Sequence, residues 1–175
     1  MSVTKWTWII VLFAAPALAV WAVSDEPAAG SDGPKLEWLK QLVGTWVRVG
    51  DDGTATDEVV SVYRETAGGS AIIETLFPGT DQEMITLYHK DGRDLVLTHY
   101  CVMGNQPRMK ATADSTRGKI AFKCAGGSNM KSENDHHMHQ ATVTVIDDNH
   151  IRSEWVSHEN GAVNHTASFS LVRKS

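Results

Sequence analysis

From residue 43 to the end of the chain, short runs of alternating apolar and polar residues follow one another. Alternation of this kind places successive side chains on opposite faces of a β-strand. It predicts ten strands, at 44–49, 58–66, 70–77, 84–90, 94–102, 108–113, 119–123, 140–146, 150–159 and 162–173. Asp, Asn and Gly in the connections 51–53, 67–69, 91–92 and 160–161 are typical of hairpin turns, because these residues adopt positive backbone angles. The pattern therefore predicts an antiparallel meander.

The number of strands predicts that the sheet closes on itself. Ten strands in one open sheet leave two long unpaired edges, which favour aggregation, whereas a closed barrel has none and can enclose a cavity. Alternation places residues 95, 97, 99 and 101 on one face of their strand, and likewise 151, 153, 155 and 157, and 167, 169 and 171. We therefore expect an all-β fold, an antiparallel meander closed into a barrel of about ten strands.

A short helix is predicted immediately before the first strand. Leu36, Leu39 and Leu42 recur at helical spacing, and Pro34 suits a first helical turn. A helix over 34–42 would close one end of the barrel.

The first residues have the features of a secretory signal peptide. Lys5 precedes an apolar run, and small residues follow it up to Ala19 and Ala22, after either of which cleavage would fit. Pro16 and these small residues favour cleavage over a retained membrane anchor. We expect a signal peptide at 1–22, a flexible linker at 23–33 and the barrel domain at 34–175, in a protein exported to the periplasm or the extracellular space.

The charge of the chain limits the classes of partner that it is expected to bind. The net charge of −5 becomes −6 without the leader, because Lys5 is the charged residue of that segment. An acidic chain without basic clusters argues against nucleic acid as a partner, and against membrane beyond the leader.

Cys101 and Cys124 fall on strands separated by one other strand, about 9–10 Å apart. Two buried thiols are therefore favoured over a disulfide, which stays an alternative.

The entrance to the barrel resembles a known family. The run Leu42-Val43-Gly44-Thr45-Trp46 after a short helix is similar to the Gly-x-Trp first strand of the calycin-type barrels, the lipocalins and their relatives. Arg173, in the closing strand, resembles their late basic residue near that Trp. The domain as a whole, with its 66–70 turn and 99–109 segment, is also similar to a lipocalin-like family of exported bacterial proteins of unknown function.

The resemblance implies a carrier of a small hydrophobic molecule, or a haem-binding barrel of the nitrobindin kind, in which His165 would be the iron ligand. It implies no enzymatic activity and no oligomeric state. The 99–109 segment, where an apolar strand gives way to polar and sulfur-containing side chains, marks the place where a ligand would bind.

We predict a partly apolar small-molecule ligand inside the barrel. Its lining candidates come from several inward-facing rows, and its rim candidates supply hydrogen-bond donors near the Gly104–Pro107 turn. The lining candidates are Trp46, Leu97, His99, Cys101, Met109, Trp155 and Phe169; the rim candidates are Asn105, Gln106, Arg108 and His139.

Metal binding is the first alternative. His99 and Cys101 point the same way on one strand, and Met109 lies on the next. With His137 and His139 folded over the mouth, these imidazole, thiol and thioether groups would suit copper or zinc. The spacing matches no standard metal motif, so a polar-lined pocket is the favoured interpretation.

Catalysis is the second alternative, a hydrolase or isomerase that uses His99 in the cavity. Glu74, Glu154 and Asp94 are its candidate orienting carboxylates. Residues two apart on a strand stand about 6–7 Å apart, too far for a direct hydrogen bond between His99 and Cys101. The sequence also lacks a Gly-x-Ser-x-Gly turn, a phosphate loop and a His-Glu-x-x-His helix. No catalytic residue is therefore assigned.

Overall fold

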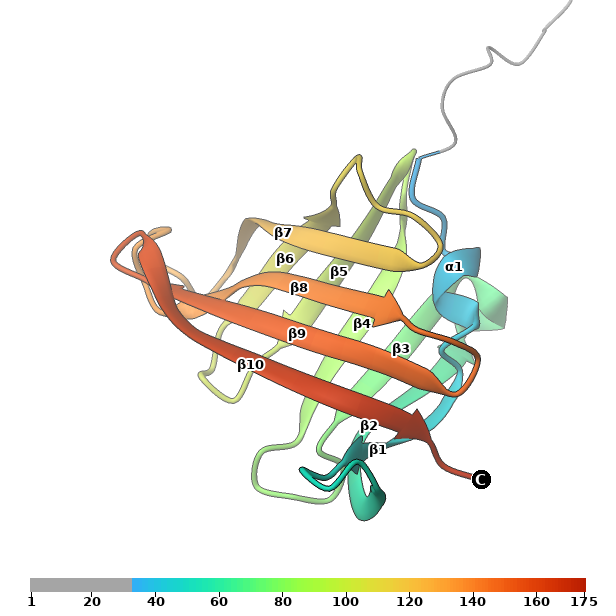
Figure 1. The fold of residues 1–175 in the computed structure, drawn as a ribbon. Helices are drawn as coiled ribbons and strands as arrows, with labels where there is room; N and C mark the ends of the chain where they lie inside the picture. The colour runs from blue at the N-terminus through green and yellow to red at the C-terminus, as the bar shows by residue number, and fades with distance from the viewer. Residues whose placement is uncertain (1–32) are drawn as a thin grey trace, which may run out of the picture. The chain divides into compact units, whose positions relative to one another are not determined.

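Ten strands and two short helical segments follow one another along residues 33–175, the part of the chain that the computed structural model describes (Figure 1). The elements are α1 (Glu37–Lys40), β1 (Gly44–Val49), β2 (Ala55–Thr66), the 3-10 turn η1 (Ala67–Gly69), β3 (Ala71–Leu76), β4 (Met84–Asp91), β5 (Asp94–Tyr100), β6 (Gln106–Ala111), β7 (Lys119–Ser128), β8 (His137–Val145), β9 (His150–Glu159) and β10 (Ala162–Arg173). The predicted signal peptide and nearly all of the predicted linker lie outside the described residues.

Each strand pairs with the next in antiparallel fashion, and β10 pairs with β1, so the sheet is a closed barrel. The predicted all-β meander and its closure are confirmed, and the fold is compatible with that of the lipocalins. Three strands, β1, β9 and β10, have the predicted bounds. The largest differences are in β7, which runs on to Ser128, and at the starts of β2 and β8, which begin at Ala55 rather than at residue 58 and at His137 rather than at residue 140.

Burial follows the predicted alternation. On β9, Ile151, Ser153, Trp155 and Ser157 are all buried, whereas Arg152 is exposed. These inward rows join those of the other strands in one apolar core that includes Leu97, Met109 and Phe122. The barrel is therefore filled mainly by side chains.

Helix α1 covers one end of the barrel. It is shorter than predicted, a single turn of four residues, yet Leu36, Leu39 and Leu42 are all buried, as their spacing implied. Figure 1 shows α1 at one end of the barrel and the turn between β9 and β10 at the other. The second end carries no helix in the described residues.

The first and last strands meet where the barrel closes. The Arg173 guanidinium stacks over the Trp46 ring, 4.3 Å from its centroid, and donates hydrogen bonds to the carbonyl oxygens of Val43 (2.7 Å) and Gln41 (2.9 Å). Gly44 permits this approach, since it has a φ of 136° and an added Cβ would lie 2.6 Å from Arg173 Nη1. The Gly-x-Trp motif thus has a local physical reason.

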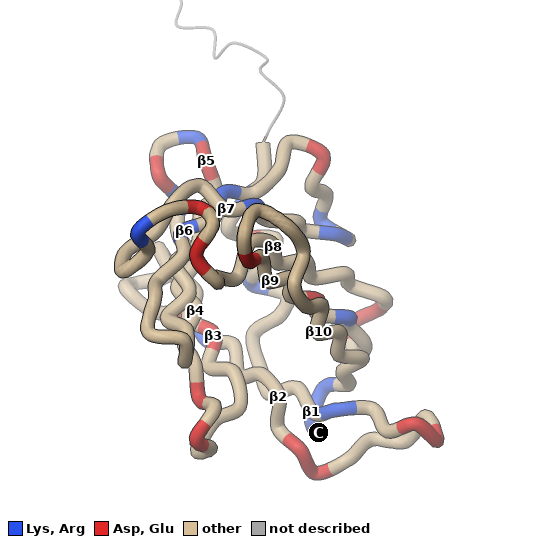
Figure 2. The backbone as a smooth tube through the Cα atoms, turned by 90° about the vertical axis from the view of Figure 1, so that its left-hand side faces the viewer, with Lys and Arg blue, Asp and Glu red and all other residues tan. Residues whose placement is uncertain are grey.

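Acidic and basic residues lie largely at the strand ends and connecting turns (Figure 2). Ion pairs such as Lys110 with Asp94 and Arg108 with Asp91 are on the surface. No helix within residues 33–175 is both long and apolar enough to cross a membrane.

Candidate ligand-binding site

A row of polar residues crosses the inside of the barrel. Tyr63 of β2 is in register with Glu74 of β3, Glu74 with Thr86 of β4, and Thr86 with His99 of β5. All four side chains are buried. Burying polar groups is costly unless they are hydrogen-bonded, so their partners determine what the row can do.

Glu74 is the buried carboxyl group of this row. Its Oε1 accepts a hydrogen bond from Ser61 (2.9 Å), and its Oε2 accepts one from the hydroxyl of Tyr88 (2.6 Å). Burial raises the pKa of Glu74, while these hydrogen bonds act in the opposite direction. Glu74 is therefore held in place by two hydroxyl donors.

His99 differs from Glu74, because one of its ring nitrogens has no partner. Its Nδ1 lies 2.9 Å from Thr86 Oγ1, whereas its Nε2 is buried without a hydrogen bond. The Trp155 ring packs against the imidazole, with centroids 4.6 Å apart. Burial lowers the pKa of His99 to about 4, so the ring is neutral at physiological pH.

His99 lines a partly enclosed pocket of about 90 Å³ at the barrel end opposite α1. The other walls are almost entirely apolar: Leu76, Phe77, Met84, Met138, Trp155, Ala167 and Phe169. An apolar cavity of about 150 Å³ accommodates benzene, and drug-sized ligands occupy about 300–1,000 Å³. The pocket is thus matched to a small apolar group rather than to a large ligand.

The backbone of the pocket wall is strained at Phe77. This residue has a φ of 49°, a left-handed conformation that a bulky side chain rarely adopts. Its ring packs edge-on against Phe169, with centroids 5.7 Å apart, and its N–H donates to the Val60 carbonyl. Strain of this kind persists where surrounding contacts hold it, and it is frequent at ligand sites.

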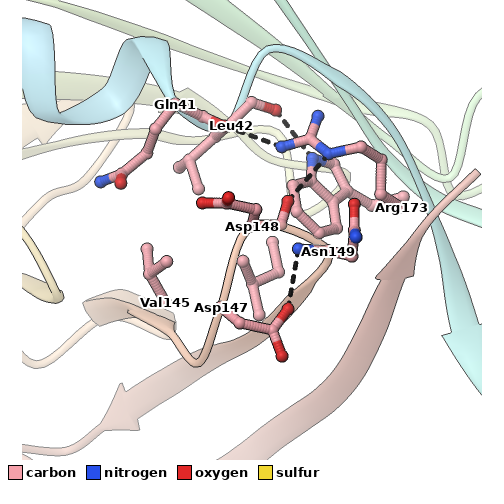
Figure 3. Close-up of a pocket in the computed structure, with 9 residues that line it drawn as sticks. Gln41, Leu42, Val145, Asp147, Asp148, Asn149 and Arg173 are labelled. Carbon is pink, nitrogen blue, oxygen red and sulfur yellow. Dashed lines mark hydrogen bonds between the residues drawn. The ribbon is translucent and has the colours of Figure 1, made fainter.

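A larger pocket, of about 330 Å³, lies at the α1 end beside Trp46 and Arg173 (Figure 3). Several of its polar groups are already engaged in hydrogen bonds. Arg173 is bound to backbone carbonyls, including that of Asp148 (3.0 Å), and Asp147 accepts hydrogen bonds from the Asn149 N–H (2.8 Å) and His150. We assign this pocket to barrel closure, because His99, whose Nε2 is buried without a partner, lines the smaller pocket.

The predicted lining residues divide between several places. His99, Trp155 and Phe169 come together in the small pocket, and Trp46 lines the larger one. Leu97 and Met109 are fully buried in the core. Cys101 is buried at the turn after β5, where its N–H donates to the Asn105 carbonyl, and it lines neither pocket.

The predicted rim residues make contacts of a structural kind. Asn105 is buried and donates to the His136 carbonyl (2.8 Å), which ties the β5–β6 turn to the segment before β8. Gln106 donates to the Gly104 carbonyl, and exposed Arg108 pairs with Asp91. None of the three lines either pocket of the described barrel.

The residues of the predicted metal set are also divided. In the described part of the chain, one group of three His, Cys, Asp or Glu side chains brings its ligand atoms within 4.8 Å of one another, and it consists of Cys124, His137 and His139. His99 and Cys101 are outside this group, and both cysteines are free, so the disulfide alternative is not realised. Burial lowers the pKa of His139, as does the proximity of His158 and His137.

The start of β8, which carries His137 and His139, reaches the small pocket. Met138, between His137 and His139, is one of the pocket walls together with His99. His165, the residue that the resemblance offers as an iron ligand, is exposed on β10 and lines neither pocket. Asp94, one of the candidate orienting carboxylates, pairs with Lys110 on the surface. The side chain that hydrogen-bonds to His99 is that of Thr86 and not a carboxylate.

Sequence reasoning did not anticipate Thr86, Phe77 or Cys124 as parts of these sites. Thr86 had a usable signal, because the alternation of β4 places it on the same face as the buried Tyr88. Comparison of the chain with protein-family models finds no match, and comparison with curated proteins finds none either.

Proposed function

We propose that the protein is an exported, lipocalin-like carrier that binds a small, mainly apolar molecule, or the apolar end of a larger one, in the pocket lined by His99. The observation that carries the proposal is the neutral, buried imidazole with an unpartnered Nε2 in the wall of an otherwise apolar pocket. A buried polar atom without a partner costs free energy, which a ligand with one hydrogen-bonding atom would recover.

The polar row explains how His99 is positioned. Thr86 contacts Nδ1, and Trp155 packs against the ring, so Nε2 is left for the ligand. Depending on the imidazole tautomer, Nε2 either donates or accepts the hydrogen bond. The thioether side chains of Met84 and Met138 lie in the same wall, and their flexibility suits a pocket that adjusts as the ligand enters.

The ligand is small because the pocket is small. A short alkyl group with one hydroxyl, carbonyl or carboxyl group matches both the volume of about 90 Å³ and the single polar side chain of the pocket. Export from the cytoplasm follows from the pattern of residues 1–22 and is part of the proposal.

Mass spectrometry of organic extracts from the protein, purified from its native compartment, is the direct test. We expect a small organic molecule to be released from wild type and to be depleted in His99→Asn, in which the amide can still reach Thr86 but no atom occupies the position of Nε2. His89→Asn, on a partly exposed histidine of β4, is the matched control.

A second arm uses defined probes. Short-chain alcohols, ketones and carboxylic acids are added to wild type and to His99→Asn while thermal unfolding is followed. A rise in Tm that requires His99 supports the carrier. No released molecule and equal Tm values with and without every probe would overturn it.

A further inference from the structure

A second site lies on three neighbouring strands near the pocket. Cys124 of β7 and His137 and His139 of β8 bring one ligand atom each within 4.8 Å of one another, and His158 of β9 stacks on His139. From these positions we propose that Cys124, His137 and His139 bind a zinc ion through one thiolate and two imidazole nitrogens. This proposal does not depend on the carrier function.

The spacing of the two imidazoles suits one ion. His137 Nε2 and His139 Nδ1 lie 3.0 Å apart. Two nitrogens bound to a tetrahedral zinc at about 2.0–2.1 Å are roughly 3.3 Å from each other, so only a small adjustment is needed. Their placement depends on the bulge between Met138 and Gln140, which shifts the register of β8 against β9 at His139.

The other nitrogen of His137 has the partner that metal-binding histidines usually have. Its Nδ1 lies 2.7 Å from the Asp135 carbonyl oxygen, which can accept only from N–H. The proton therefore resides on Nδ1 and the lone pair on Nε2, the atom that faces His139. A backbone carbonyl in this role fixes the tautomer and the ring orientation of a metal ligand.

The surroundings hold the ligands in place. His137 is fully buried, and the His139 and His158 rings are nearly parallel, with centroids 3.9 Å apart and an angle of 8°. Cys124 makes only a long contact, 3.5 Å from Sγ to the Gly126 carbonyl. Thiolate and imidazole together favour zinc over the hard cations calcium and magnesium, and three protein ligands leave the fourth position for water.

The alternative is that His137 and His139 form only a hydrogen-bonded pair and that the Cys124 thiol binds nothing. Such a pair would have the same short nitrogen–nitrogen distance. The two interpretations differ in what happens when metal is added. At a metal site, zinc would bind tightly and the Cys124 thiolate would be one of its ligands. If the two histidines form only a hydrogen-bonded pair, the Cys124 thiol would make no difference to zinc binding.

The test is a titration of the reduced, chelator-treated full chain with Zn²⁺, and with Co²⁺ as a spectroscopic probe. We expect one ion per chain, a rise in Tm on Zn²⁺ addition, and a thiolate-to-Co²⁺ charge-transfer band in the near ultraviolet. Cys124→Ser and His139→Gln should weaken Zn²⁺ binding roughly tenfold or more, and Cys124→Ser should abolish the charge-transfer band.

Matched controls exist for both ligand types. Cys101→Ser removes the second thiol and His150→Gln removes a histidine bound to Asp147, and both should leave the titration unchanged. The proposal is overturned if wild type binds no Zn²⁺ at micromolar concentration, if Co²⁺ gives no sulfur band, or if Cys101→Ser and Cys124→Ser behave alike. Circular dichroism of Cys124→Ser verifies that its barrel is intact.

Discussion

The hydroxyl of Thr86 lies 2.9 Å from Nδ1 of His99, on the neighbouring strand, and both side chains are buried. The contact leaves Nε2 as the ring nitrogen without a hydrogen-bond partner. It is also the point at which the polar row and the apolar pocket meet.

Thr86→Val removes this hydrogen bond at nearly constant volume. We expect the free energy of unfolding to fall by about 1–2 kcal/mol, because Nδ1 of His99 is left buried without a partner. Chemical denaturation measures the change. Thr98→Val, at a half-buried position of β5, is the control. In a His99→Leu background Thr86→Val should cost much less, and an undiminished cost there would mean that the two side chains do not interact.

His99 should make the protein less stable in mild acid. Its pKa is about 4 in the folded protein because of burial, whereas an exposed imidazole titrates near 6.5. Between these values the unfolded chain takes up a proton that the folded chain does not, so stability is lost as pH falls from about 6.5 to about 4. The full effect is ~3 kcal/mol, and denaturant titrations at several pH values should show it in wild type but not in His99→Asn. Parallel pH profiles would contradict the assignment.

Glu74 should act in the opposite direction. Because burial raises its pKa, its contribution to stability is complete below the ordinary value of about 4.5 and is lost as pH rises through the folded value. Glu74→Gln keeps an acceptor oxygen for one of the two hydroxyls of Ser61 and Tyr88, offers an amide N–H to the oxygen of the other, and should remove this pH dependence. Glu74→Leu should cost about 1–3 kcal/mol at any pH, since both hydroxyls lose their acceptor. Equal stabilities of the Gln and Leu variants would show that the hydroxyls need no partner.

At Phe77 the usual ranking of alanine over glycine should reverse. Both variants lose the packing of the ring on Phe169, but only glycine adopts a φ of 49° without strain. We expect Phe77→Gly to be more stable than Phe77→Ala by about 1 kcal/mol. Thermal unfolding of the two proteins gives the answer, and the ordinary order would mean that the backbone relaxes.

The strands could be predicted where alternation was unbroken. β9 and β10 have the predicted bounds, because apolar and polar residues alternate through Trp155 and Phe169. The start of β8 differs from the prediction because the residues from His137 to His139 show no apolar alternation. The end of β7 differs because Gly126 and Gly127 interrupt the alternation of that strand. In both places pairing with a neighbouring strand overrides local preference.

The candidate site could be predicted only in part for a different reason. His99, Trp155 and Phe169 were found as inward-facing residues of single strands, which needs only the two-residue period. The contact of Thr86 with His99 and the meeting of Cys124 with His139 depend on register between strands. Register is set by the turns and bulges of the whole sheet, so it cannot be predicted from the sequence of any one strand.

The pairing of Trp46 with Arg173 has a consequence for the order of events during synthesis. β1 can pair with β10 only after β10 has been synthesised. Nearly the whole barrel must therefore emerge from the ribosome before Trp46 and Arg173 can meet. Until then the sheet has two open edges, and the pocket lacks the wall that Ala167 and Phe169 supply. A chain that ends before β10 therefore lacks part of the pocket wall, and the pocket is complete only in the closed barrel.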